Sequence, residues 1–129
     1  ESHLDFSFSG LKTAVLYAFR SEKNPSDTVK ADLAASFQEA VAETLFLKSQ
    51  LAIAQNGLDK LVIGGGVASN KYIRKRLIEG LKGNKIFFPP INRCTDNGAM
   101  VAVTGHYRLS KKNISSDIVI RPKWNLSEL

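Results

Sequence analysis

The clearest pattern of apolar and polar positions lies in residues 60–77, KLVIGGGVASNKYIRKRL. Three bulky apolar residues at 61–63 are typical of a buried strand. The glycines at 64–66 allow the backbone to turn sharply and to approach a ligand. Ser69 or Asn70 can cap the helix that follows. The apolar stripe of that helix is Tyr72, Ile73 and Leu77.

This pattern predicts a strand, a tight turn and a helix. In open α/β folds, ligands bind at the carboxyl ends of the strands, where this turn would lie. The first turn of a helix also attracts phosphate through its free N–H groups. A nucleotide or phosphate site and a purely structural turn both account for the glycines, so the glycines alone leave the two interpretations open.

The first half of the chain predicts a strand and two helices. Residues 5–9 alternate phenylalanine with serine, which predicts a short strand. Helical spacing predicts a helix over 11–20, which the Asn-Pro pair at 24–25 ends. Serine or aspartate at 26–27 can cap a second, longer helix that stops before Gly57. The apolar positions of the longer helix are Leu33, Phe37, Val41, Leu45 and Leu51.

The last part of the chain predicts a second strand and a final helix. Residues 85–88 are typical of a strand, which the prolines at 89–90 end because proline cannot donate to a strand ladder. Aspartate or asparagine at 96–97 can cap a helix over 99–109. From Lys111 onward we expect a closing tail with alternating isoleucines at 118 and 120.

The order of these elements predicts an α/β fold with at least one parallel pair of strands. At 129 residues the chain, 1–129, fits a single domain. Two or three strands are fewer than a typical sheet contains, so we expect this domain to be incomplete. An opening at Glu1 without a methionine fits the same expectation of a piece of a longer protein.

Composition and charge narrow the class of protein and of partner. A hydrophobic content of 43% with 23% charged residues is ordinary for a globular protein. No apolar run approaches the roughly 20 residues that cross a bilayer, so we expect no membrane association. The one cysteine, Cys94, excludes an internal disulfide and favours a reducing compartment. The net charge of +6 favours an anionic partner such as nucleic acid.

Several blocks of sequence closely resemble one protein family. They are DFSFSGLKTAV at 5–15, LVIGGGVASN at 61–70 and CTDNGAM at 94–100, with further similarity in ADLAASFQEAV at 31–41 and RPKW at 121–124. In this order they resemble the carboxy-terminal part of the TsaD (Gcp) family of tRNA N6-adenosine threonylcarbamoyltransferases. The resemblance implies an actin/sugar-kinase/Hsp70-like ATPase fold, of which this chain would supply part of the second lobe.

The resemblance also implies a function. Family members transfer a threonylcarbamoyl group from threonylcarbamoyl-AMP to N6 of adenosine 37 in tRNA. The implied partners are tRNA, an adenine nucleotide and TsaB- and TsaE-type proteins, and the implied location is the cytoplasm. We expect the isolated chain to be inactive, because half of the family's cleft would be absent.

Three other functions stay open. A metalloendopeptidase, the activity behind the older glycoprotease name, is disfavoured because the chain has no HExxH zinc motif. An ATPase or phosphotransferase is a second alternative, since a fold does not determine its chemistry. The third is a module that binds RNA or a protein partner without catalysis.

Four residues match functional positions of the family. Asn70 matches an asparagine that contacts the adenylate, and Gly65 and Gly66 match glycines that pass under the nucleotide, where a side chain would clash. Asp96 matches an aspartate that binds one divalent metal ion, Fe²⁺ or Zn²⁺, together with two histidines of an HxxxH motif. The HxxxH motif is absent from this chain, and neither of the chain's two histidines, His3 and His106, matches it. For both Asn70 and Asp96 the alternative is a helix cap.

Two further features invite a functional interpretation. Six cations form a basic cluster, which either flanks the tRNA backbone or is a solvated helix face: Lys71, Arg74, Lys75, Arg76, Lys82 and Lys85. Cys94 is interpreted as a structural thiol, because the sequence predicts no histidine or basic partner beside it.

Overall fold

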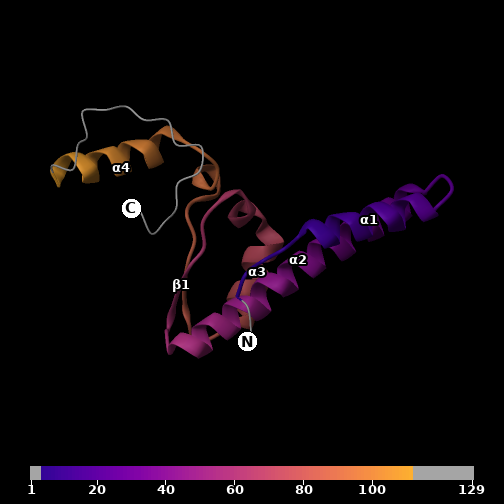
Figure 1. Ribbon diagram of the computed structural model, residues 1–129, viewed down its shortest axis with the longest axis horizontal. Helices are drawn as coiled ribbons and strands as arrows, with labels where there is room; N and C mark the ends of the chain where they lie inside the picture. Colours follow the sequence, from indigo (N-terminus) through magenta and orange to yellow (C-terminus); the bar gives the residue numbers. More distant parts are fainter. Residues whose placement is uncertain (1–3, 112–129) are drawn as a thin grey trace. The chain divides into compact units, whose positions relative to one another are not determined.

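The computed structural model describes residues 4–111, and Figure 1 shows the chain as a ribbon. The chain divides into two units, Glu1–Thr95 and Asp96–Leu129. The second unit contains α4 (Gly98–Ser110). The first unit contains α1 (Ser9–Ser21), α2 (Asp27–Asn56), β1 (Lys60–Val62), the 3₁₀ turn η1 (Gly66–Ser69), α3 (Lys71–Gly80), β2 (Lys85–Phe87) and the 3₁₀ turn η2 (Ile91–Arg93). The predicted tail with Ile118, Ile120 and RPKW lies outside the described residues.

Helices α1 and α2 form where helical spacing predicts them. The Ser26 hydroxyl accepts a hydrogen bond from the Val29 N–H at 3.2 Å and so caps α2. Gly57 ends α2 in the left-handed conformation, with φ of 60°. α2 is 30 residues long, yet neither it nor another helix within residues 4–111 is apolar enough over a sufficient length to cross a membrane.

The two strands form a parallel pair joined through α3, which confirms the predicted α/β class. Lys60 lies opposite Lys85, Leu61 opposite Ile86 and Val62 opposite Phe87. A further bond from the Ile63 N–H to the Phe87 carbonyl, 3.0 Å long, continues the pairing past the last strand residues. Because the strands are parallel, both carboxyl ends reach the same edge, where the glycine turn and the proline-rich loop begin.

The prediction of a buried β1 strand is wrong for the described residues. Leu61 and Ile86 are half-buried on the face that packs against the helices. Their neighbours Val62 and Phe87 are 77% and 51% exposed. Successive side chains of a strand point to opposite faces, and within residues 4–111 only one face of this sheet is covered.

The strand predicted over 5–9 is also wrong. Residues 4–8 are irregular and Ser9 begins α1. The alternation still places Phe6 and Phe8 together, with their rings stacked and centroids 6.1 Å apart. A strand requires a partner strand for its backbone groups, and the sheet of the described residues contains only β1 and β2.

The hydrophobic core holds α3 against α2. Ala42 and Phe46 of α2 contact Ile73 and Leu77 of α3, and all four are at most 9% exposed. Leu81 completes this cluster just after α3, and the half-buried residues Leu61 and Ile86 of the strands pack on it. This packing holds α3, and with it the glycine turn before α3, against α2.

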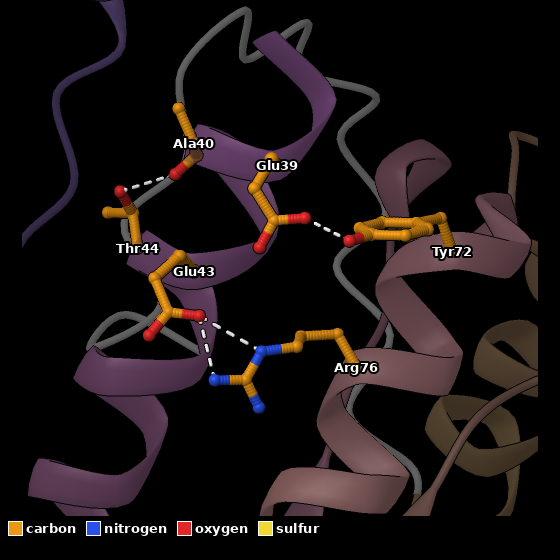
Figure 2. A network of polar contacts seen from close by, with 6 residues as sticks. All are labelled: Glu39, Ala40, Glu43, Thr44, Tyr72 and Arg76. Carbon is orange, nitrogen blue, oxygen red and sulfur yellow. Dashed lines mark hydrogen bonds and ion pairs between the residues drawn. The ribbon is translucent and has the colours of Figure 1, made fainter. Parts of the chain in front are cut away.

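A polar network runs beside this core and is shown in Figure 2. The Tyr72 hydroxyl donates to the Glu39 carboxylate. One turn further along α3, the Arg76 guanidinium donates twice to the Glu43 carboxylate, at 2.9 and 2.7 Å. The same guanidinium lies 3.7 Å from the centroid of the Phe46 ring. These contacts fix the register of α3 on α2 along the solvent side of the core.

Gly80 allows the close approach of Phe46 to the end of α3. A Cβ atom at Gly80 would lie 2.5 Å from Phe46 Cε2 and from Arg76 Nη1. The arginine tip can move away, but the packed ring must shift. We expect Gly80→Ala to lower the free energy of unfolding by about 1–3 kcal/mol in urea titration. The matched control is Gly10→Ala in α1, where the added atom meets nothing within 4 Å and stability should hold or rise. Equal stability of the two variants would contradict this packing.

Tyr72 offers a test of the polar network by its ionisation. The hydrogen bond to Glu39 raises the pKa of Tyr72 above its ordinary value of about 10. The folded chain therefore keeps this proton to higher pH than the unfolded chain. The stability that the bond contributes is complete below the unfolded pKa and is lost as pH rises through the folded pKa. In an NMR titration of the Tyr72 ring, Glu39→Gln should lower the pKa.

Glu43→Gln is the matched control for this titration. Glu43 raises the pKa of Tyr72 only through space and is the weakest of the causes. Its replacement should therefore shift the pKa less than Glu39→Gln does. An unchanged pKa in Glu39→Gln would contradict the Tyr72–Glu39 bond.

Candidate nucleotide-contacting turn

The glycine turn joins β1 to α3 through a single 3₁₀ turn. The Ala68 N–H donates to the Gly65 carbonyl and the Asn70 N–H to the Val67 carbonyl, each at 3.0 Å. Ala68 is 1% exposed and anchors the turn. The Ser69 hydroxyl donates to the Gly66 carbonyl at 2.7 Å, so Ser69 stabilises the turn and is not the helix cap.

Asn70 is the cap of α3, as one of the two sequence interpretations predicts. Its Oδ1 accepts hydrogen bonds from the N–H groups of Tyr72 and Ile73, at 2.9 and 3.1 Å. Its Nδ2 donates to Gln38 Oε1 on α2 at 3.1 Å. The amide oxygen has two lone pairs and both are used. Asn70 therefore offers a ligand one amide N–H as a donor, and no acceptor.

The cap changes the phosphate interpretation of this helix. A phosphate at a helix N-terminus binds the backbone N–H groups of the first turn. Here the Tyr72 and Ile73 N–H groups are already bonded to Asn70. A ligand at this turn consequently meets the Asn70 side chain rather than those two donors.

The structural requirement for glycine differs among positions 64, 65 and 66. Gly65 has φ of 87° and ψ of 171°, a conformation that other residues rarely adopt. A Cβ at Gly66 would meet only the Thr95 methyl at 3.8 Å, an ordinary contact, and one at Gly64 would meet nothing within 4 Å. The backbone thus requires glycine at 65, whereas nothing among the described residues requires it at 66.

A cavity of about 720 Å³ lies beside this turn, inside the first unit. Gly66, Ser69 and Asn70 line it from the turn, and α2 contributes apolar side chains such as Phe37 and Val41. The size and the mostly apolar wall with a few polar groups are usual for a small-molecule site.

Sequence reasoning missed two polar residues that line this cavity. They are Lys12 of α1, a cation, and Gln38 of α2, an amide that holds Asn70. Both lie inside blocks that resemble the TsaD family, DFSFSGLKTAV and ADLAASFQEAV. Those blocks were therefore the available signal, although spacing alone could not bring three separate segments to one cavity.

The basic cluster does not form one solvent-facing flank. Arg74 is half-buried, and its guanidinium donates to the carbonyl oxygens of Ala68 and Pro89. Arg76 is bonded to Glu43, and Lys85 lies 3.9 Å from an Asp59 carboxylate oxygen. All four lysines of the cluster are exposed, and among them Lys71, Lys75 and Lys82 lie on α3 and the turn that follows it. The prediction of a surface made of all six cations is therefore wrong, because both arginines of the cluster bond protein groups.

Cys94 is buried, at 4% exposure, as expected of a structural thiol. Its Sγ accepts a hydrogen bond from Arg74 Nη2 at 3.2 Å and lies 3.5 Å from the Pro90 carbonyl oxygen. The basic partner that the sequence did not predict is therefore present, and it is a member of the basic cluster. Burial keeps this thiol from acting on a substrate in solution.

Asp96 lies in the second unit, whereas Gly65, Gly66 and Asn70 lie together in the first. Asp96 is exposed and is not the cap of α4. The cap is Asn97, whose side chain accepts from the Met100 N–H at 3.0 Å. Among residues 4–111, no three His, Cys, Asp or Glu side chains gather closely enough to hold a metal ion. One exposed carboxylate is an insufficient donor set, so these residues do not by themselves fit a metal.

Comparison with known proteins matches one family model and many curated relatives. A family model described as TsaD, tRNA N6-adenosine threonylcarbamoyltransferase, matches residues 1–103. A curated tRNA N6-adenosine threonylcarbamoyltransferase of Francisella philomiragia is 47% identical over 123 residues. The match covers 94% of this chain and 37% of the relative, so the chain spans little more than a third of the relative's length.

The two hydrogen-bonding roles of Asn70 can be separated by substitution. Asn70→Ala removes the cap and should lower the free energy of unfolding by about 1–2 kcal/mol. Asn70→Asp keeps an oxygen acceptor for the Tyr72 and Ile73 N–H groups and loses only the donor to Gln38, so in urea titration it should lose less stability than Asn70→Ala. A loss in Asn70→Asp as large as in Asn70→Ala would contradict the cap assignment.

Proposed function

The chain belongs to the TsaD family of tRNA N6-adenosine threonylcarbamoyltransferases, and on this premise we propose that its glycine turn contacts the adenylate of threonylcarbamoyl-AMP. The whole protein would transfer the threonylcarbamoyl group to N6 of adenosine 37 in tRNA. This chain would supply one wall of the nucleotide cleft.

One observation carries the proposal. Asn70 is held rigidly by three hydrogen bonds and retains one amide N–H beside a cavity of ligand size. A donor that is already ordered loses little conformational entropy when it binds a ribose or base acceptor. Gly66 supports the same role. Among the described residues there is room for a side chain at this position, so the chain itself does not require glycine there. A nucleotide that passes over the turn would fill that room and would require glycine.

The proposal extends to the rest of the protein. We propose that residues 1–129 form part of the second lobe of an actin/sugar-kinase/Hsp70-like fold. The uncovered apolar face at Val62 and Phe87 supports this, since a further layer would bury it.

Asp96 would contribute one ligand to an Fe²⁺ or Zn²⁺ ion whose histidine ligands belong to another part of the protein. The proposed partners are tRNA and TsaB- and TsaE-type proteins, in the cytoplasm.

The adenylate contact is tested by NMR titration of the ¹⁵N-labelled 129-residue chain with AMP. We expect shifts in the amides of residues 64–70. Asn70→Asp and Gly66→Ala should both stay folded and should weaken binding about fivefold to tenfold, because Asn70→Asp loses the amide donor and Gly66→Ala places a methyl group against the ligand.

Gly64→Ala is the matched control, since a side chain there meets open space. It should bind AMP as wild type does. Unchanged amides of residues 64–70 at millimolar AMP would contradict the adenylate contact. Modification of tRNA by the isolated 129-residue chain would contradict the expectation that this chain is inactive alone. Proteolysis by the whole protein, without a modified tRNA product, would favour the peptidase alternative.

A further inference from the structure

Arg74 of α3 lies at the edge of the sheet where two segments leave the strands. One segment is the glycine turn, residues 64–70, after β1. The other is the loop of residues 89–95 after β2. Arg74 Nε donates to the Ala68 carbonyl of the turn at 2.5 Å. Its Nη2 donates to the Pro89 carbonyl of the loop, also at 2.5 Å. One guanidinium therefore bonds both segments.

Two more contacts fix the orientation of this guanidinium. Nη2 also donates to Cys94 Sγ at 3.2 Å, near the far end of the loop. Its Cζ atom lies over the Phe88 ring, 4.7 Å from the ring centroid. Only arginine combines a planar fork of donors with a face that stacks on an aromatic ring.

The strand pairing does not by itself connect the turn to the loop. The bond between Ile63 and Phe87 continues the ladder to the point where the segments begin. Beyond it, the turn and the loop approach each other at Gly66 and Thr95, where a Cβ on the glycine would lie 3.8 Å from the threonine methyl. Arg74 bonds carbonyls on both sides of this approach.

We propose that Arg74 is a positioning residue that holds the glycine turn and the loop of residues 89–95 in one arrangement. A ligand that orders the turn then also orders the loop. This second statement rests on the proposed adenylate contact, whereas the first does not depend on any ligand.

Hydrogen exchange of the full 129-residue chain tests the proposal. Each segment has hydrogen-bonded amides that serve as reporters: Ala68 and Asn70 in the turn, Arg93 and Cys94 in the loop. Arg74→Gln should speed exchange roughly tenfold or more in both segments, because both lose a bond to a charged donor. The Leu81 amide, bonded to the Leu77 carbonyl in the core, is the internal reference and should change less.

Arg76→Gln is the matched control, two residues away on the same helix. Arg76 also stacks on a phenylalanine and bonds a carboxylate, but it contacts neither segment. It should lower global stability without a selective effect on the turn and loop. Equal effects of Arg74→Gln and Arg76→Gln on the reporters, or acceleration of only one segment by Arg74→Gln, would overturn the proposal.

Arg74→Lys decides the question if Arg74→Gln does not fold. Lysine keeps the charge but lacks the fork, so at least one segment should still exchange faster than in wild type. Wild-type protection of both segments in Arg74→Lys would overturn the assignment to the guanidinium fork.

A second arm adds AMP. In wild type, AMP should slow exchange in the turn and in the loop, and in Arg74→Lys it should slow exchange in the turn alone. A loop response that survives in Arg74→Lys would overturn the coupling. If AMP changes neither segment of the wild type, the adenylate contact fails, while the ligand-free comparison still decides the role of Arg74.

Discussion

The packing of α3 on α2 is the constraint on which the rest of the first unit depends. Phe46, Ile73 and Leu77 form its buried centre. Burying such side chains contributes roughly 1.5–3 kcal/mol each, whereas a solvent-exposed ion pair contributes at most about 1 kcal/mol. The hydrophobic contact therefore decides that the helices meet, and polar contacts such as Arg76–Glu43 decide the register.

The register matters because the first residues of α3 define the candidate site. Asn70 reaches Gln38 on α2 only because the packing holds the two helices in this register. Its cap in turn ends the glycine turn at a definite place. The cap and the ligand contact are compatible roles for one side chain, since the oxygen serves the helix and one N–H remains on the nitrogen.

Charges that look equivalent along the chain have different roles in space. Arg74 and Arg76 are two residues apart in one basic run, yet one bonds the carbonyls of the sheet edge and the other bonds α2. Residues two apart on a helix point in different directions, so they do not share a face. Any electropositive surface for tRNA on α3 and the turn that follows it would consequently rest on the exposed lysines at 71, 75 and 82.

Local interactions were determined by the sequence alone. Helical spacing, the Ser26 cap, the Gly57 stop and the prolines after β2 act through neighbouring residues, so the helices and the parallel pair could be predicted within a few positions. The motif blocks also named Asn70 and the glycines as candidates for ligand contact, which stays a prediction. Contacts between residues far apart in the chain were decided only by the tertiary structure. Examples are the bond of Asn70 to Gln38 and the bonds of Arg74 to the turn, the loop and Cys94. The exposure of Val62 and Phe87 on one face of the strands was decided in the same way. A strand pattern such as that of residues 5–9 forms a strand only where another strand accepts its hydrogen bonds, and that depends on which distant segments the fold brings beside it.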